Sequence, residues 1–283
     1  MLTACAPKEK TADSTSASAS STPVAMSATT AATVAPAPNV VTVHAKDFSY
    51  DAPSTIPAGM TTFRLINDGK TMHHINIVRL DSGKTLADLK HELAMPATPP
   101  SWAQFFGGPN AVGPGQEANA TVNLVPGNYA MVCFVDVPGG VPHFAKGMIQ
   151  PFTVVAGQAG PTAAAPSADE TITLTDYAFD LSTPLTAGKH TFAVKNMGSQ
   201  PHEVELVRLA PGKTIENLLA WMTKPAGPPP ASLVGGVSGF QGVENYFTAD
   251  VTSGTYGLIC FLPDVKDGKP HFMHGMTKTV TVM

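Results

Sequence analysis

The sequence contains two copies of a residue set that is typical of a metal site: a His, a Cys, a second His and a Met, in that order. The first copy comprises His73, Cys133, His143 and Met148, and the second comprises His202, Cys260, His271 and Met276. Two imidazoles and a thiolate in a trigonal arrangement, with a weak axial thioether, bind a single copper ion that passes between Cu(I) and Cu(II). We therefore expect copper as the cofactor, in up to two mononuclear sites.

Both sets belong to a duplicated segment. Matched residues recur 127 to 129 positions apart along its whole length. The matched pairs are Asn67 and Asn196, His73 and His202, Arg79 and Arg208, Gly107 and Gly235, Cys133 and Cys260, His143 and His271, and Met148 and Met276. Solenoid repeats have much shorter periods, of roughly 20–50 residues. Each copy is therefore expected to fold around a core of its own.

Strand periodicity predicts which way the first His points. Alternate residues of a strand share a face, so His73 lies on the same face as the apolar Ile75 and Ile77. The same rule in the second copy places Glu203 and Glu205 on the opposite, outward face. An inward His at the start of a buried strand is well placed to meet a loop at that end of the domain.

A metal-free role is the alternative for these residues. A lone buried Cys is more often a small hydrophobic core residue than a ligand, and a Met often only fills a gap in a core. The recurrence of all four residue types in both copies favours metal ligation over packing alone. The copies differ at neighbouring positions, for example at His74 and Glu203.

Composition divides the chain into four parts. Residues 11–38 are almost entirely Ala, Ser, Thr and Pro, a composition that buries too little apolar surface to fold. We predict a tether at 1–38, a first domain at 39–155, a linker at 156–168 and a second domain at 169–283.

Charge and cysteine content exclude several protein classes. Charged residues make up 13% of the 283 residues and the formal net charge is −4, so the basic surface of a nucleic-acid-binding protein is not expected. The chain lacks an apolar run of about 20 residues that would cross a membrane. Its cysteines, Cys5, Cys133 and Cys260, are too far apart for a disulfide scaffold or a Cys-x-x-Cys motif.

Local patterns predict an all-β fold. Period-two alternation or apolar runs indicate strands at 41–44, 62–66 and 129–134, and at 171–174, 191–194 and 256–261. Gly 25 and Pro 26 are high counts that favour a protein rich in turns. Thr85 and Thr214 are expected to cap one short helix in each copy. Several short strands with frequent turns imply two β-sandwiches.

Three motifs in each copy resemble those of the cupredoxins, the plastocyanin and azurin family. In the first copy they are the turn Asn67-Asp68-Gly69 before His73, the strand Gly127-Asn128-Tyr129 leading to Cys133, and the spacing His143-x4-Met148. The likeness covers nearly all of 39–155 and 169–283. It implies two Greek-key β-sandwiches and copper ligation by the eight residues named above. For electron transfer we expect the exit at the loop His of each site, the ligand nearest the surface.

The loops between Cys and the second His are longer than in most cupredoxins. They contain nine residues at 134–142 and ten at 261–270, and both are rich in Pro and Gly. We expect each loop to fold outward as a hairpin and to leave the Cys close to the second His.

The N-terminal tetrapeptide Leu2-Thr3-Ala4-Cys5 fits the lipobox that precedes the modified cysteine of a bacterial lipoprotein. Only Met1 precedes the box, so we expect a truncated or mis-assigned start. Lipidation of Cys5 would place the protein in the periplasm or at the cell surface, anchored through lipid alone and to the outer membrane where one exists. A chance match in an Ala- and Thr-rich tail is the alternative.

The function expected from these observations is electron transfer, with one type 1-like copper site per domain and redox proteins as partners. Storage or delivery of copper, with copper donors and acceptors as partners, is a second reading, and a metal-free scaffold for protein binding is a third. The sequence has no His-x-His pair, and Phe134 and Phe261 follow the cysteines where oxidases often have His. On these grounds we expect no enzymatic activity.

Overall fold

The strands form where apolar residues alternate with polar ones. The computed structural model describes residues 36–95, 100–157 and 163–283, so Cys5, most of the predicted tether and residues 158–162 of the predicted linker lie outside the described residues. In β1 (Asn39–Lys46), Val41, Val43 and Ala45 are buried while their neighbours are at least partly exposed. Such a strand covers a core with one face and meets solvent with the other.

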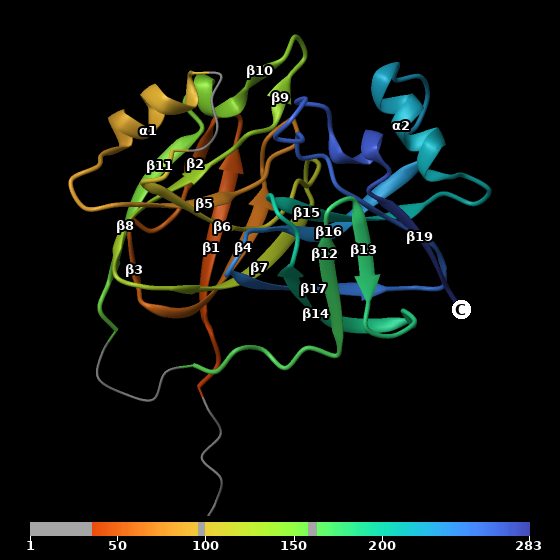
Figure 1. The fold of residues 1–283 in the computed structure, drawn as a ribbon, viewed down its shortest axis with the longest axis horizontal. Coiled ribbons are helices and arrows are strands. Elements are labelled where there is room, and N and C mark those ends of the chain that lie inside the picture. Colours follow the sequence, from red (N-terminus) through yellow and green to blue (C-terminus); the bar gives the residue numbers. More distant parts are fainter. Residues whose placement is uncertain (1–35, 96–99, 158–162) are drawn as a thin grey trace, which may run out of the picture. The chain divides into compact units, whose positions relative to one another are not determined.

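The first half is a sandwich of two sheets (Figure 1). One contains β2 (Ser49–Asp51), β1, β4 (Gly59–Asn67) and β7 (Glu117–Leu124). The other contains β3 (Thr55–Pro57), β11 (Ile149–Val155), β8 (Gly127–Val132), β5 (Asn76–Leu80) and β6 (Ala103–Gly107). Phe63 of β4 meets Phe152 of β11 between them, with ring centroids 6.1 Å apart. Burial of such rings is the main stabilising contribution of the core.

The second half repeats this plan. One sheet contains β13 (Ala178–Leu181), β12 (Glu170–Thr175), β14 (Gly188–Asn196) and β17 (Glu244–Val251). The other contains β16 (Ala231–Gly239), β15 (His202–Leu209), β18 (Gly254–Ile259) and β19 (Thr277–Val282). Phe192 and Phe247 stack at 4.6 Å in a core separate from that of the first half. The predicted all-β fold class is therefore confirmed.

One short helix covers each sandwich, as the caps predicted. The helices are α1 (Leu86–Leu93) and α2 (Ile215–Thr223). Thr85 and Thr214 are the N-caps, and each accepts a hydrogen bond from the backbone N–H three residues on. Leu89 of α1 and Leu218 of α2 are buried against the outer faces of β5 and β15, respectively. None of the described helices is long and apolar enough to cross a membrane.

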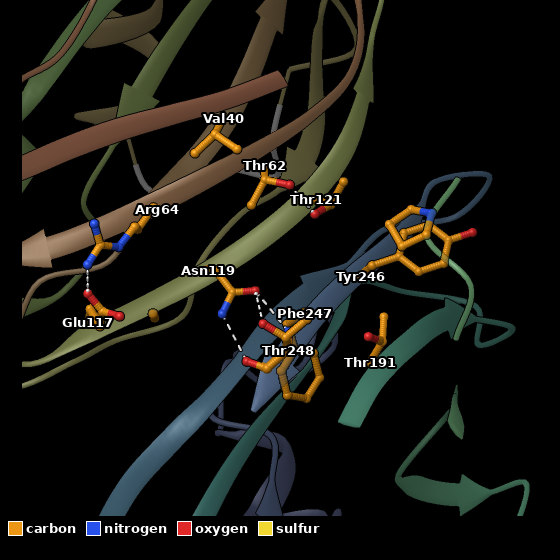
Figure 2. Close-up of a pocket in the computed structure, with 12 residues that line it drawn as sticks. Val40, Thr62, Arg64, Glu117, Asn119, Thr121, Thr191, Tyr246, Phe247 and Thr248 are labelled. Atoms are coloured by element: carbon orange, nitrogen blue, oxygen red, sulfur yellow. Dashed lines mark hydrogen bonds and ion pairs between the residues drawn. The ribbon is translucent and has the colours of Figure 1, made fainter. Parts of the chain in front are cut away.

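The two halves are joined through their sheets. β7 pairs with β17 through Tyr246 and Thr121, which makes one eight-stranded sheet. Figure 2 shows the same junction beside a hollow of about 380 Å³. There the amide NH₂ of Asn119 donates to the carbonyl of Thr248 at 2.9 Å, and the amide oxygen of Asn119 accepts from the N–H of Thr248 at 2.8 Å. The hollow is lined by none of the eight predicted copper ligands. A Cβ on Gly107 would lie 2.2 Å from the carbonyl oxygen of Ser238, so this close approach requires glycine.

Candidate metal centres

Loops at one end of each sandwich carry the predicted ligands of that half. In the first half His73 lies before β5, Cys133 follows β8, and His143 opens the 3-10 helix η1 (His143–Lys146). The amide of Asn67, at the end of β4, donates to the carbonyls of Thr71 and Val112 at 2.8 Å and so shapes the turn that presents His73. Asn196 makes the corresponding bonds in the second half.

The ligand atoms converge in both halves. Nδ1 of His73 lies 3.2 Å from Nδ1 of His143, which lies 3.5 Å from Sγ of Cys133. In the second half Nδ1 of His271 lies 3.0 Å from Nδ1 of His202 and 3.2 Å from Sγ of Cys260. Two nitrogens and a sulfur within this span fit around one ion whose bonds are roughly 2.0–2.3 Å long.

The methionines lie at the same places in both halves. Met148 and Met276 are fully buried in the sandwich cores. The backbone N–H of Cys133 donates to the carbonyl of Met148 at 3.1 Å, and that of Cys260 donates to the carbonyl of Met276 at 3.3 Å. The backbone of each Met therefore lies beside that of its Cys. The axial role of its sulfur stays a prediction.

Both long loops leave Cys and His together, as predicted. In the first half the loop contains the hairpin of β9 (Asp136–Val137) and β10 (Val141–Pro142). In the second half a bridge between Pro263 and Pro270 closes the corresponding loop. The extra residues are thus accommodated outside the centre and not between its ligands.

The second His of each set, predicted to be the ligand nearest the surface, is buried beneath an aromatic ring, and its role as the electron exit stays a prediction. His143 and His271 are each 0% exposed. The ring of Phe48 meets His143 edge-on with centroids 5.1 Å apart, and Tyr177 meets His271 in the same way at 5.6 Å. Phe48 and Tyr177 have φ values of 64° and 68°, unusual for residues with a side chain, and these turns place their rings over the histidines.

Two aspartates that the sequence analysis did not single out hold the first His of each site. Oδ1 of Asp47 lies 3.2 Å from Nε2 of His73, and Oδ1 of Asp176 lies 2.8 Å from Nε2 of His202. A carboxylate at Nε2 keeps the proton on that nitrogen and leaves the Nδ1 lone pair facing the centre. Asp47 and Asp176 are themselves 129 positions apart, so the repeat register was the signal that would have revealed them.

A glycine lies against the same imidazole in each half. A Cβ on Gly69 would come within 2.6 Å of Nε2 of His73, and a Cβ on Gly198 within 2.6 Å of Nε2 of His202. The side chains of Asn67 and Asn196 accept from the N–H of these glycines at 2.9 and 2.8 Å. Only glycine therefore allows the turn to pack on the ring.

Burial keeps the donor groups neutral. It raises the pKa of the Cys133 thiol to about 11 and that of Cys260 further. Burial and the neighbouring His202 lower the pKa of His271 to about 4, and burial lowers that of His73. Neutral imidazoles are ready to bind a metal, whereas each thiol must release its proton when a metal binds.

The residue after the first His supports the sulfur side of each centre. Nε2 of His74 accepts from the N–H of Phe134 at 2.7 Å, and Oε1 of Glu203 accepts from the N–H of Phe261 at 3.0 Å. Burial raises the pKa of Glu203 to about 7. Glu203 and Glu205 lie on the face opposite to Val204 and Leu206, as predicted, but that face is not open to solvent: they are 8% and 4% exposed.

The physical reason is a contact from the other half of the chain. The side chain of Asn110, from the loop after β6, donates to the carbonyl of Val204 at 3.0 Å. Burial raises the pKa of the neighbouring Glu205 well above its ordinary value. Strand alternation in one half does not reveal that the other half covers its outer face.

The residues present fit a copper ion. Two imidazole nitrogens and one thiol sulfur are the donor atoms that copper prefers in such sites. In each half a carboxylate also holds Nε2 of the first His. The two Nδ1 atoms of each pair face each other at 3.0–3.2 Å. Without a metal their lone pairs repel each other unless one of the two nitrogens carries a proton. A shared cation removes this conflict.

Comparisons with known proteins add the following. No family model and no curated protein matches the sequence. Among solved structures, auracyanin from Roseiflexus castenholzii is 26% identical and is matched over 42% of this chain and 99% of its own, with a TM-score of 0.28. Copper nitrite reductase from Nitrosomonas europaea is 15% identical over 88% of this chain and 94% of its own, with a TM-score of 0.27. Blue copper oxidase from the same organism is 12% identical over 86% of both chains, with a TM-score of 0.26.

These comparisons correct one prediction. The nitrite reductase and the oxidase are enzymes by their titles, and each match spans most of this chain. The prediction that excluded any enzymatic activity was therefore wrong. A missing His-x-His pair and Phe134 or Phe261 after the cysteines are local features, and they do not exclude every reaction of a two-sandwich copper protein. With TM-scores this low, the fold class rests on the strand pairing of this chain itself.

Proposed function

We propose that the protein is a copper-binding electron-transfer protein with one type 1-like centre in each half. The observation that carries the proposal is the convergence of two Nδ1 atoms and one Sγ in both halves, with neighbouring contacts of 3.0–3.5 Å. When bound, copper supplies a one-electron couple between Cu(I) and Cu(II). The chain holds both imidazoles and the sulfur in place before the ion arrives, so little rearrangement accompanies a change of oxidation state.

Complete burial of the donors favours this function over copper storage or delivery. The six His and Cys residues are 0% exposed. Delivery requires a ligand that a copper acceptor can reach, and no such ligand is offered at either centre. Electron transfer requires only close approach of a redox partner protein, because an electron passes through packed side chains such as Phe48 or Tyr177.

The same geometry favours a metal over a metal-free scaffold. A buried polar group without a suitable partner destabilises a fold by about 1–3 kcal/mol, and without a metal the two Nδ1 atoms of each pair face each other at 3.2 and 3.0 Å as competing acceptors. Apolar residues at these positions would pack without that penalty. Two histidines and a cysteine are therefore an unfavourable choice for packing alone.

We place the protein in the periplasm or at the cell surface, held by lipid on Cys5. The support is the sequence Leu2-Thr3-Ala4-Cys5 followed by a low-complexity segment. One acyl chain gives only marginal binding, whereas several chains on one cysteine hold firmly. Mass spectrometry of the natural protein is expected to find a lipid on Cys5, and an unmodified protein in the soluble fraction would contradict the anchor.

Copper loading tests the main proposal. Purified protein treated with Cu(II) is expected to bind two copper ions and to show the intense visible band of a thiolate bound to Cu(II). The double variant Cys133→Ser/Cys260→Ser is the matched control and is expected to lose the band. A stoichiometry near zero would overturn the copper proposal, and a weak band with bound copper would favour storage over electron transfer.

A further inference from the structure

The two centres have different surroundings although their ligands are the same. Two positions exchange their side chains between the halves. Phe48 and Tyr50 in the first half correspond to Tyr177 and Phe179 in the second. A phenol hydroxyl is thus present in both halves, but it lies at a different side of the centre in each.

In the first half the hydroxyl bonds the backbone and not a carboxylate. Tyr50 is 8% exposed, and its hydroxyl donates to the carbonyl of His74 at 2.5 Å. A hydroxyl has one hydrogen, and this bond uses it. The phenol of the first half therefore holds no charged group beside its centre.

In the second half the hydroxyl holds a buried carboxylate beside the second His. Oδ2 of Asp264 accepts from Tyr177 at 2.5 Å and from the amide of Gln200 at 2.8 Å. Its Oδ1 accepts from the backbone N–H of Lys266 at 2.8 Å. Three donors keep this carboxyl ionised. Oδ2 lies 3.8 Å from Nε2 of His271, and the Asp264 side chain is 2% exposed.

The first half has no equivalent charge at this place among its described residues. Asp136 lies seven residues before His143, as Asp264 lies seven before His271, but it is exposed to solvent. Water and salt screen an exposed charge far more than a buried one. Thr71 and Phe48 stand where the second half has Gln200 and Tyr177.

We propose that the two centres hold copper at different reduction potentials, with the higher potential in the first half and the lower one in the second. The inference rests on the proposed function. The buried negative charge of Asp264 favours Cu(II) at the second centre, whereas the corresponding Asp136 of the first half is exposed to solvent. An electron that enters the protein therefore comes to rest on the first centre, and the second centre passes electrons to it.

Single-site proteins test the difference directly. Cys260→Ser leaves the first centre and Cys133→Ser leaves the second, and each is titrated electrochemically while the thiolate–Cu(II) band is followed at one pH and ionic strength. At equal applied potential, the ratio of Cu(II) to Cu(I) is expected to be at least tenfold higher at the second centre, which corresponds to about 59 mV. Equal potentials, or the reverse order, would overturn the inference.

Point variants then assign the cause. In the Cys133→Ser background, Asp264→Asn is expected to lower the ratio of Cu(II) to Cu(I) at least threefold, whereas Asp136→Asn in the Cys260→Ser background is expected to change it less than twofold. If Asp264→Asn does not fold, the two single-site potentials still decide the matter. A missing band in both single-site proteins refutes the proposed function and the inference with it, whereas bands with equal potentials refute the inference alone.

Discussion

Removal of the charge at Asp176 is expected to weaken copper binding at the second centre without removing a ligand. Asn has the shape of Asp and can still accept from the imidazole, but it does not stabilise the charge that the ring shares with a bound cation. Loss of such an outer carboxylate lowers metal affinity roughly 10- to 100-fold, which is about 1.4–2.8 kcal/mol.

The structure places Asp176→Asn at the upper end of that range and Asp47→Asn at the lower end. The distance to Nε2 is 2.8 Å for Asp176 and 3.2 Å for Asp47. Asp176 is also held by the hydroxyl and the N–H of Ser199, at 2.6 and 2.9 Å. These bonds and the one to His202 lower its pKa to about 2. Asp47 accepts from the N–H of Lys70 and the hydroxyl of Thr71 at 2.9 and 3.3 Å, so Asp176, with the shorter hydroxyl bond and the shorter bond to its imidazole, orients the ring more strongly.

The assay is competition with a coloured Cu(I) chelator, in proteins that keep a single centre. Cys133→Ser serves as the background for Asp176→Asn, and Cys260→Ser serves for Asp47→Asn. Asp180→Asn, at an exposed position of β13, is the control for removal of a carboxylate elsewhere. If Asp176→Asn stays within twofold of the control, the carboxylate does not hold the ring and the tautomer argument fails.

Three further predictions concern the ligands and their packing. Cys133→Ser is expected to remove one copper ion and to leave the Cys260 site intact, which metal analysis checks; loss of both would show that the centres depend on each other. Gly198→Ala places a Cβ about 2.6 Å from Nε2 of His202, and we expect a loss of about 1–3 kcal/mol in unfolding free energy, measured in urea, with weaker copper binding at that site. The pKa of His271 falls from 6.5 to about 4 in the folded state, so as the pH is lowered His271 of the metal-free protein is protonated in the unfolded chain before it is protonated in the folded one. The contribution of His271 to the free energy of unfolding is therefore complete above pH 6.5 and declines by roughly 3 kcal/mol as the pH falls to about 4. An unchanged urea midpoint over that pH range would contradict the burial argument.

The clustering of two His and one Cys in each half, and the secondary structure, could be predicted because their signals are local or repeated. Strand alternation around Val41 and Val43 is readable within eight residues, and the cap at Thr85 within four. His73 and Cys133 are far apart in sequence, but their recurrence 129 and 127 residues later marks them as a set. A duplicated chain thus carries an internal comparison that a single domain lacks.

The burial of the centres could not be predicted, because it depends on contacts between distant segments. Phe48 reaches His143 across 95 positions only because a turn with a φ of 64° follows β1. Glu205 is buried next to Val204, whose carbonyl accepts from Asn110 of the other half. Neither contact leaves a periodic pattern, and each overrides an inference that was sound for an isolated strand or loop.

The repeat register also separates what the two centres share from what distinguishes them. Asp47 and Asp176 have the same residue type and the same contact in both halves, which is expected of a group that prepares an imidazole to bind any copper ion. Asp264 and its donor Tyr177 belong to the second half alone, and they touch the outer side of its second His. A substitution at Asp264 or Tyr177 leaves the ligand set intact and alters the electrostatic field at the metal centre. Duplication followed by such changes gives one chain two centres with the same chemistry and different affinities for an electron, which two identical copies would not provide.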